Sequence, residues 1–337
     1  MKPTLLEKTL VGIYKSAMDT TGKAPRSVSL TGAPGGGKTT LWKQVAHDLQ
    51  IPIIVKHMPT MVVEDFGIPY LRAESDVFDY KMPHWWPLES VAPPRGILLF
   101  DDRNQCGPDI QKVNANIEQE RTLHGHKLPD GWWVVSTGNR KEDRAGSGQV
   151  LTHLQDRETT INFDTDLEDW IGWALDHNVR PEVVSFIKFR PGLLHDFKAD
   201  QDKSSTPRGW VEGVSDSMGT IPPEAEYEWF SGAVGEGAAA EFTGYMRIWR
   251  KLPDPIGTLE NPTTTPVPDD MATLYALSGA LAAHVTHKLF GNMIKYLERM
   301  PPEFAVLTMS YLIRKDESFA EHPDFAPWAT QHQSLMF

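Results

Sequence analysis

The stretch from Ser27 to Gln50, SVSLTGAPGGGKTTLWKQVAHDLQ, sets the architecture of the first half of the chain. It begins with a short apolar run of β-strand character, continues into a glycine-rich loop, and ends in a segment whose apolar residues recur at helical spacing. A strand, a glycine loop and a helix in this order satisfy the pattern G-x-x-x-x-G-K-[ST], which cradles phosphate groups. The competing interpretation is a glycine-rich turn that matches the pattern by chance.

The chemistry of this loop favours nucleotide binding. Glycines allow conformations in which successive backbone N–H groups point at phosphate oxygens, and a helix start adds the positive end of its dipole. Lys38 is predicted to reach the β- and γ-phosphates of ATP, and the Thr39 hydroxyl to bind Mg²⁺. The candidate nucleotide-binding residues are Gly32, Pro34, Gly35, Gly36, Gly37, Lys38, Thr39 and Thr40.

Further short apolar runs follow at 51–55, 96–100, 132–136 and 159–163. They lack strict alternation and are separated by long connections, which is typical of buried parallel strands joined by crossover helices. We therefore predict an α/β domain over residues 1–164, in which helices flank a parallel sheet.

Polar residues follow two of these runs. Asp101 and Asp102 end the run GILLFDD at 96–102, and Asn139 comes directly after WWVVSTG. Asp101 is the candidate Mg²⁺ ligand, and Asp102 is the candidate base that polarises the attacking water. Asn139 lies where open α/β sheets bind ligands, and its amide is suited to hold the γ-phosphate and the water. The alternatives are an aspartate pair that begins a turn and an asparagine chosen for its turn conformation.

Beyond residue 163 the pattern becomes helical, so residues 165–337 are predicted to form an all-α region. Helices are expected near 169–177 and 181–189, from 207, and over 223–251, 269–284, 286–299 and 301–315. The segment 252–270 is rich in proline and threonine and is predicted to be a loop, because its prolines forbid a continuous helix.

Composition narrows the class of protein. The chain has 337 residues, a formal net charge of −12 and a single cysteine, Cys106, so no intrachain disulfide can form and a reducing cytoplasm fits best. The first 20 residues predict an amphipathic helix rather than a secretory signal, and no apolar stretch is long enough to span a bilayer. The excess of acidic residues disfavours a nucleic-acid partner, although a local basic patch or pore stays possible.

In their order and spacing, the motifs of this chain resemble those of the AAA+ ATPases, and within them the MoxR-like group. The resemblance covers nearly the whole chain and is carried by GAPGGGKTT (32–40), ILLFDD (97–102), VVSTGNR (134–140), EDRAG (142–146), HLQDR (153–157), TPRGW (206–210), VGEGAAAEF (234–242) and YLERMPPEFAVL (296–307). It implies a P-loop NTPase AAA+ core followed by an all-α lid and C-terminal region, with ATP and Mg²⁺ as ligands.

The resemblance also implies roles for individual residues. Arg157 matches the arginine finger that reaches the nucleotide of a neighbouring subunit, and Arg208 matches the second sensor, which contacts the γ-phosphate from the lid. Asn139 matches the first sensor, whereas Asp143 and Arg144 match a structural or interface segment. The family generally has glutamate where this chain has Asp102, and the shorter side chain can misplace the water and slow hydrolysis.

Two hairpin-like insertions, 61–86 and 118–133, fit the same family plan, and the second carries a Pro-Asp-Gly turn signal at 129–131. In MoxR-like proteins such insertions face a ring pore or a partner. The tryptophans 85, 86, 132 and 133 are either exposed for gripping and subunit contacts or buried in the core, and burial is favoured for Trp133, which begins a strand. His124 and His126 are interpreted as part of a polar loop, since further metal-ligand spacing is missing.

The leading functional hypothesis is an ATP-driven chaperone, a homo-oligomeric ring, expected to be a hexamer, that hydrolyses ATP at subunit interfaces and remodels protein clients. The resemblance implies a partner with a von Willebrand factor A domain, and the lack of an apolar stretch long enough to span a bilayer predicts no membrane association. The alternatives are a nucleic-acid motor or translocase, which the net charge disfavours, and an ATP-gated scaffold with slow hydrolysis, which Asp102 motivates.

Overall fold

The computed structural model describes residues 1–73, 76–140, 143 and 158–336. The chain divides into two compact units, Met1–Thr165 and Asp166–Phe337. Each unit has its own hydrophobic core, and each is described by itself below.

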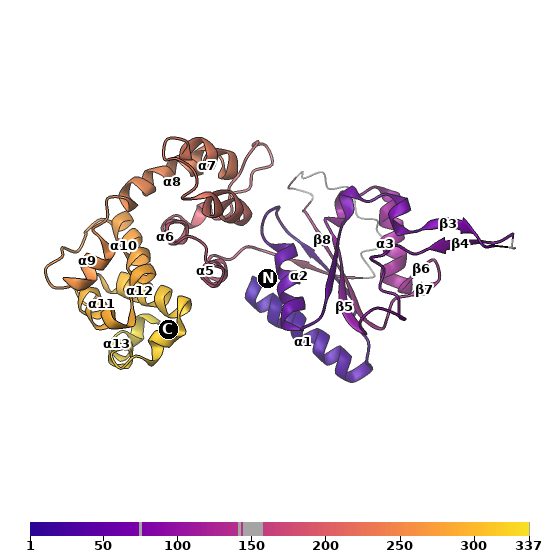
Figure 1. Ribbon diagram of the computed structural model, residues 1–337, viewed down its shortest axis with the longest axis horizontal. Coiled ribbons are helices and arrows are strands. Elements are labelled where there is room, and N and C mark those ends of the chain that lie inside the picture. The colour runs from indigo at the N-terminus through magenta and orange to yellow at the C-terminus, as the bar shows by residue number, and fades with distance from the viewer. Residues whose placement is uncertain (74–75, 141–142, 144–157, 337) are drawn as a thin grey trace. The chain divides into compact units, whose positions relative to one another are not determined.

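A parallel five-stranded sheet forms the centre of the first unit (Figure 1), with the strand order β2-β5-β8-β1-β9. The apolar runs become strands because both faces of the sheet are covered by other elements, which suits continuous apolar stretches. The prediction of a parallel α/β sheet is confirmed. The strands are β1 (Ser27–Thr31), β2 (Ile53–His57), β5 (Arg95–Asp101), β8 (Gly131–Gly138) and β9 (Glu158–Asn162).

Helices cover both faces of this sheet, and successive residues of each strand point to opposite layers. Ile97 and Leu99 pack with α1 (Pro3–Thr21) and α2 (Lys38–Asp48) on one face. Leu98 and Phe100 pack with α3 (Pro108–Glu120) on the other face. Figure 1 shows α3 on the opposite side of the sheet from α1 and α2. The N-terminal segment is the predicted amphipathic helix.

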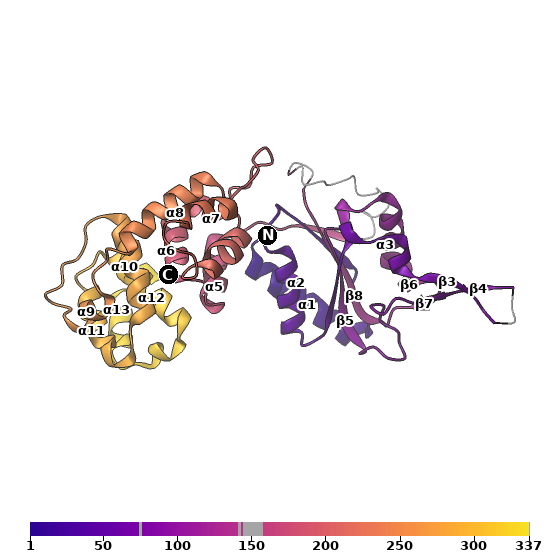
Figure 2. The same cartoon turned by 45° about the horizontal axis from the view of Figure 1, so that its top comes forward.

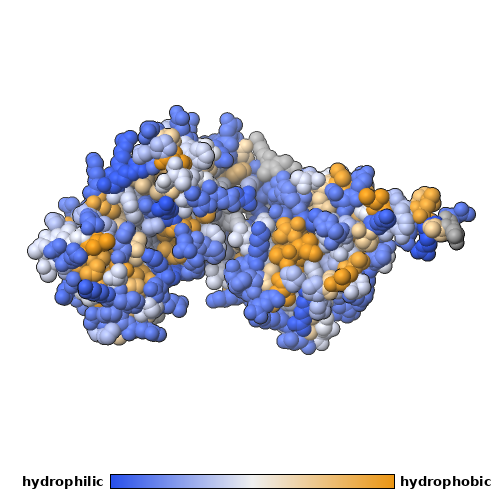
Figure 3. All heavy atoms as spheres, in the orientation of Figure 1, coloured by the Kyte–Doolittle hydropathy of each residue, from blue (hydrophilic) through white to orange (hydrophobic). Residues whose placement is uncertain are grey.

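Both predicted insertions contain hairpins. Strands β3 (Ile68–Leu71) and β4 (Phe78–Lys81) pair antiparallel and extend away from the sheet (Figure 2), and their apolar side chains are exposed (Figure 3). Strands β6 (Thr122–Leu123) and β7 (His126–Lys127) form the second hairpin. Its turn is His124-Gly125, both with positive φ, whereas the Pro-Asp-Gly signal forms a separate turn that leads into β8.

The four tryptophans of the insertions belong to the core. The exposed fractions are 6% for Trp85, 3% for Trp86, 1% for Trp132 and 0% for Trp133, so the interpretation as exposed gripping residues is wrong. A large aromatic surface gains more from burial under α3 and α2 than from solvent exposure. The insertions bring exposed aromatic and aliphatic side chains elsewhere, on β3 and β4.

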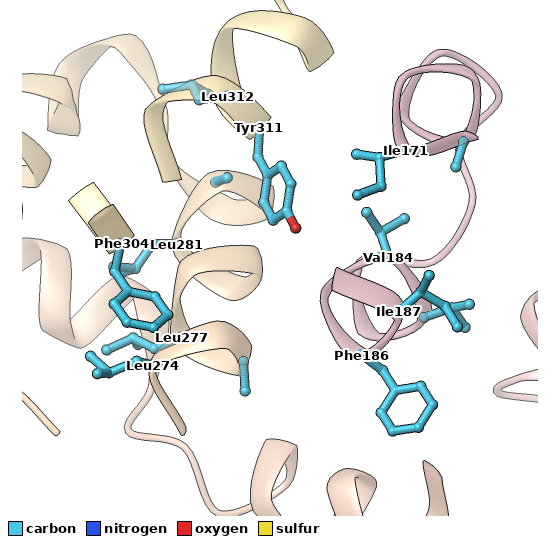
Figure 4. Close-up of a cluster of buried hydrophobic side chains, with 14 of the residues drawn as sticks. Ile171, Val184, Phe186, Ile187, Leu274, Leu277, Leu281, Phe304, Tyr311 and Leu312 are labelled. Carbon is cyan, nitrogen blue, oxygen red and sulfur yellow. The ribbon is translucent and has the colours of Figure 1, made fainter. Parts of the chain in front are cut away.

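The second unit is helical, as predicted, and one core joins its helices. Figure 4 shows side chains of α5, α6, α10 and α12 that belong to this core, among them Ile171, Phe186 and Leu277. Among the residues that the structure describes, no helix has the length and apolar character to cross a membrane. The helices are α5 (Leu167–Asp176), α6 (Pro181–Phe189), α7 (Glu226–Val234), α8 (Glu236–Trp249), α9 (Pro255–Glu260), α10 (Met271–His284), α11 (Phe290–Leu297), α12 (Pro302–Lys315), α13 (Phe325–Gln331) and α14 (Gln333–Met336).

Three helix predictions for this unit need correction. The expected helix 223–251 is broken at Gly235, whose φ of 87° ends α7 before α8 begins. The helix expected from 207 contains a π-helical turn at Gly209–Val214. The predicted loop 252–270 contains the short helix α9, because Pro255 occupies the first turn, where no N–H bond is lost, and Asp254 caps Ile256 and Gly257.

Candidate active site

The glycine-rich loop lies between the carboxyl end of β1 and the start of α2. Gly35 and Gly37 have φ values of 71° and 103°, which other residues rarely adopt, so the loop depends on glycine here. Lys38 begins α2, and the residue before it, the N-cap Gly37, has no side chain with which to cap the helix. The first N–H groups of a helix lack partners within it, and together with the helix dipole they favour an anion. The local structure therefore fits a phosphate ligand.

Lys38 is buried, with an exposed fraction of 6%, and its ammonium group is bonded to oxygens of the loop and of Asn139. It donates hydrogen bonds to the carbonyl oxygens of Gly32, at 2.9 Å, and Ala33, at 3.0 Å, and to Asn139 Oδ1, at 3.0 Å. The Lys38 side chain therefore folds back onto the glycine-rich loop that precedes it. To bind Lys38, a phosphate has to replace some of these oxygens as partners of the ammonium group.

Asp101, the last residue of β5, accepts hydrogen bonds from α2 and from β8 through one carboxylate oxygen. Its Oδ1 accepts hydrogen bonds from Thr39 Oγ1 at 2.7 Å and from Thr137 Oγ1 at 2.6 Å. This geometry brings the hydroxyl of Thr39 and the carboxylate of Asp101, the two candidate Mg²⁺ ligands, together. A hydroxyl and a carboxylate are the oxygen ligands that Mg²⁺ accepts, so this pair fits the ion.

Asp102 follows in the left-handed conformation, with φ of 53° and ψ of 38°. Its backbone N–H donates to Thr137 Oγ1 at 2.9 Å, and its Oδ1 accepts from Asn139 Nδ2 at 3.5 Å. Thr137 thus bonds both aspartates, a link that sequence reasoning missed. Only the pairing of β5 with β8 could have revealed it, because Asp101 lies one residue beyond the register pair Phe100 and Ser136.

Asn139 lies at the centre of the site, with an exposed fraction of 5%. Its side chain joins Lys38 on one side to Asp102 on the other. Its backbone is fixed by Asn104, because Asn104 Nδ2 donates to Asn139 O at 2.6 Å and Asn139 N donates to Asn104 Oδ1 at 3.1 Å. These two bonds fix the backbone of residue 139 to the turn that follows β5.

His57 is a further residue at this edge that sequence reasoning missed. It ends β2, in register with Asp101, and its Nδ1 lies 3.8 Å from Asp101 Oδ2 and 3.9 Å from Asp102 Oδ2. One donor atom of each of these residues lies within 4.8 Å of the others, which is close enough for a shared cation. The sequence did contain a signal for His57, because it closely follows the apolar run 51–55. The carboxyl ends of parallel strands lie at the same edge of a sheet, so a residue there is expected near Asp101.

The remaining candidate residues are Asp143, Arg144, Arg157 and Arg208. Arg157 and Arg144 lie outside the described residues. Asp143 forms a bidentate ion pair with Arg140, at 3.1 and 3.2 Å. Arg208 belongs to the second unit, where its exposed side chain lies 4.0 Å from Glu212.

The chain was compared with protein families, curated proteins and solved structures. No protein-family model matches the chain. No curated protein matches it either. Among solved structures, it is similar to two RuvB variants from Thermotoga maritima, each 14% identical. A lysine-to-arginine variant matches 82% of this chain and 80% of its own with a TM-score of 0.41, and a proline-to-glycine variant matches 98% and 88% with a TM-score of 0.38.

Proposed function

We propose that the chain is a Mg²⁺-dependent ATP hydrolase. The supporting observation is the chain of hydrogen bonds that joins Lys38, Asn139 and Asp102, beside the Thr39–Asp101 pair, at the carboxyl ends of β1, β5 and β8. Residues from three separate segments meet at the edge where parallel α/β sheets bind ligands. Chance placement of a glycine turn does not account for this meeting.

The binding steps belong to the loop and to Lys38. The backbone N–H groups of the glycine loop and of the α2 start hold the phosphate oxygens, and Lys38 exchanges carbonyl partners for the β- and γ-phosphates. Thr39 and Asp101 would hold Mg²⁺, and the bound ion would supply positive charge beside the phosphates.

The hydrolytic step belongs to Asp102 and Asn139. Asp102 accepts a proton from water as the water oxygen bonds to the γ-phosphorus and the bond from that phosphorus to the β–γ bridging oxygen breaks. Asn139, already bonded to Lys38 and Asp102, orients the γ-phosphate and the water. Burial of Asn139 restricts its motion, and such positioning supplies much of the catalysis in phosphoryl transfer.

The family resemblance supplies the proposal for assembly and clients. We place Arg157 as the finger that completes the site of a neighbouring subunit in a hexameric ring, and Arg208 as a sensor of the γ-phosphate. The ring remodels protein clients with a partner that carries a von Willebrand factor A domain. The net charge of −12 ranks a protein client above a nucleic-acid client, because neutralising a phosphate backbone needs clustered Lys and Arg.

A matched pair of lysine variants tests nucleotide binding. Lys38→Ala should abolish ATP binding measured by titration calorimetry, because it removes the buried ammonium group of the loop. Lys43→Ala, on the exposed face of the same helix, should bind like the wild type. Unchanged affinity in Lys38→Ala would exclude the proposed site.

Mixing variants tests the shared site. Arg157→Ala should bind ATP without hydrolysing it, and mixing it with Lys38→Ala should restore some turnover if the two residues act across a subunit interface. Absence of restored turnover in mixed rings would contradict the interface role. A pull-down with Asp102→Asn in ATP should retain the client, because binding continues while turnover stops.

An ATP-gated scaffold is the second candidate function, and the geometry of Asp102 favours it. Its carboxylate reaches only 3.5 Å from Asn139 Nδ2, which is the limit of a hydrogen bond. Turnover by the wild type should be compared with that of Asp102→Glu. A motor predicts clear wild-type turnover, whereas a scaffold predicts almost none and a gain in the glutamate variant.

A further inference from the structure

Arg103 is buried beside the candidate base and forms ion pairs that the proposed reaction does not use. Its exposed fraction is 3%, and its guanidinium donates to both oxygens of Glu158, at 2.7 and 2.8 Å, and to Glu118 Oε1 at 2.8 Å. The side chains of both glutamates are at least as buried, at 1% for Glu118 and 3% for Glu158. Three charged groups are thus removed from water within one cluster.

Stability alone is a weak reason for this cluster. Desolvating buried ions costs about as much as their attraction returns, and apolar residues of similar volume often serve equally well. Burial lowers the pKa of Arg103, but Glu118 and Glu158 outweigh that effect and raise it above its ordinary value. The arginine therefore stays charged, and the fork of its N–H groups fixes direction as well as distance.

The cluster ties distant elements to one short turn. Arg103 begins the 3₁₀ turn Arg103–Gln105 that follows β5, Glu118 lies in α3, and Glu158 begins β9. Glu158 is also in register with Ser27 of β1, the strand that leads into the phosphate loop. The ion pairs of Arg103 therefore fix the position of this turn relative to α3 and to β9.

The residues on either side of Arg103 belong to the active site. Asp102 precedes it in a left-handed conformation, which costs a non-glycine residue free energy and persists only where its surroundings impose it. Asn104 follows it and makes both backbone hydrogen bonds to Asn139. A shift of the turn would displace the base and its partner together.

We propose that Arg103 is a positioning residue for Asp102. Its ion pairs to α3 and β9 hold the turn so that Asp102 keeps its left-handed conformation and directs its carboxylate toward Asn139. This inference rests on the proposed hydrolysis, in which Asp102 polarises the water.

The test replaces the cluster by apolar residues instead of leaving a charge unpaired. In the triple variant Arg103→Met, Glu118→Met and Glu158→Leu, the fold should persist and the ATP affinity should stay within about twofold, since Lys38 and its loop are untouched. The kcat should fall roughly 10- to 100-fold, because a small misplacement of a catalytic group has that effect. Arg103→Lys keeps the charge without the fork, and its kcat should be intermediate.

Arg121→Met is the matched control. Arg121 donates to the carbonyl oxygens of Pro129 and Trp132, near the amino end of β8 and away from Asp102. Its loss should lower the melting temperature while the kcat of the folded protein stays unchanged. A kcat in the triple variant equal to that of the wild type would overturn the positioning role.

A second readout needs no turnover. Cys106 ends the turn, its thiol donates to Arg103 O at 3.0 Å, and it is the single cysteine of the chain. Labelling of this thiol by a disulfide reagent should accelerate about tenfold or more in the triple variant, because the turn opens more often. Wild-type labelling in the triple variant would contradict the inference even if the wild type hydrolyses no ATP, whereas that lack of hydrolysis would itself refute only the proposed function.

Discussion

At the scale of single residues, the proposed base Asp102 occupies a backbone conformation that is unfavourable for aspartate. Sequence preference alone would not place an aspartate in the left-handed region at a strand end, since the conformation costs on the order of 1 kcal/mol. Thr137 and the neighbouring turn hold it there through hydrogen bonds. The proposed base therefore depends on residues that never touch the substrate.

Cys106 offers a direct test of this local order through pH. Burial raises the pKa of its thiol to about 11, above the ordinary value of 9.0 for an accessible thiol. The thiolate is the reactive form, so labelling of the native protein at pH 8 should be slow and should rise between pH 9 and 11. Labelling of the protein in denaturant should be fast at pH 8.

The raised pKa of the Cys106 thiol also determines how the stability of the protein changes with pH. Because the folded protein holds the proton more tightly than the unfolded chain, the contribution of this thiol to stability is full below pH 9 and is lost as the pH rises toward 11. Denaturant titrations of wild type and Cys106→Ala should diverge over this range. A parallel pH dependence of both proteins would contradict the assignment.

At the scale of elements, the strands were predictable and several helices were not. The central strands β1, β5 and β8 are buried on both faces, so most of their residues are apolar or small and the sequence displays them directly, whereas the edge strands β2 and β9 are more exposed. The break at Gly235 and the short helix α9 depend on a single glycine conformation and a single aspartate cap. The spacing of apolar residues is a pattern over many positions, so it cannot predict a break or a cap that depends on one residue.

The candidate site divides in the same way. Lys38, Asp101 and Asn139 follow strands and could be identified from motif and position. Arg103 could not, because its partners Glu118 and Glu158 come from other segments of the chain, whereas the place of His57 could be expected only from its position after a parallel strand. The burial of Trp85 and Trp86 likewise depends on how the insertion folds back onto the sheet.

The packing of α3 on the sheet contains an unusual buried amide. Asn114 is fully buried, and neither its Nδ2 nor its Oδ1 has a hydrogen-bond partner among the described residues. An unsatisfied buried polar group costs about 1–3 kcal/mol, and valine has a similar helix propensity. We expect Asn114→Val to raise the free energy of unfolding by about 1 kcal/mol in urea titrations. A loss of stability would show that the amide has a partner, such as a buried water.

Two glycines of the second unit provide an opposed pair of predictions. A Cβ at Gly213, in the π-helical turn, would come 2.5 Å from the Cβ of Ala233 in α7, so Gly213→Ala should destabilise the protein by about 1–3 kcal/mol. A Cβ at Gly232, inside α7, meets nothing within 4 Å, so Gly232→Ala should stabilise it by about 0.5–1 kcal/mol. Thermal unfolding of both variants tests the packing of this turn on α7, and equal shifts would contradict it.

At the scale of the whole molecule, the two units divide the proposed chemistry unequally. Every described hydrogen bond among the phosphate loop, the aspartates and Asn139 lies within Met1–Thr165. The second unit has its own core and contributes Arg208 to the proposal. Binding and hydrolysis should therefore separate when the chain is cut between the units.

The fragment 1–165 tests this separation. It keeps both cores that flank the sheet, so we expect it to fold, to unfold cooperatively and to bind ATP. Its ATP turnover should fall at least about tenfold, because the positive charge proposed to stabilise the γ-phosphate is missing. Full-length Arg208→Ala should show the same loss, whereas Arg247→Ala, on α8 of the same unit, should not. If the fragment hydrolyses ATP at the full-length rate, the helical unit has no part in the reaction and its role lies in clients or assembly.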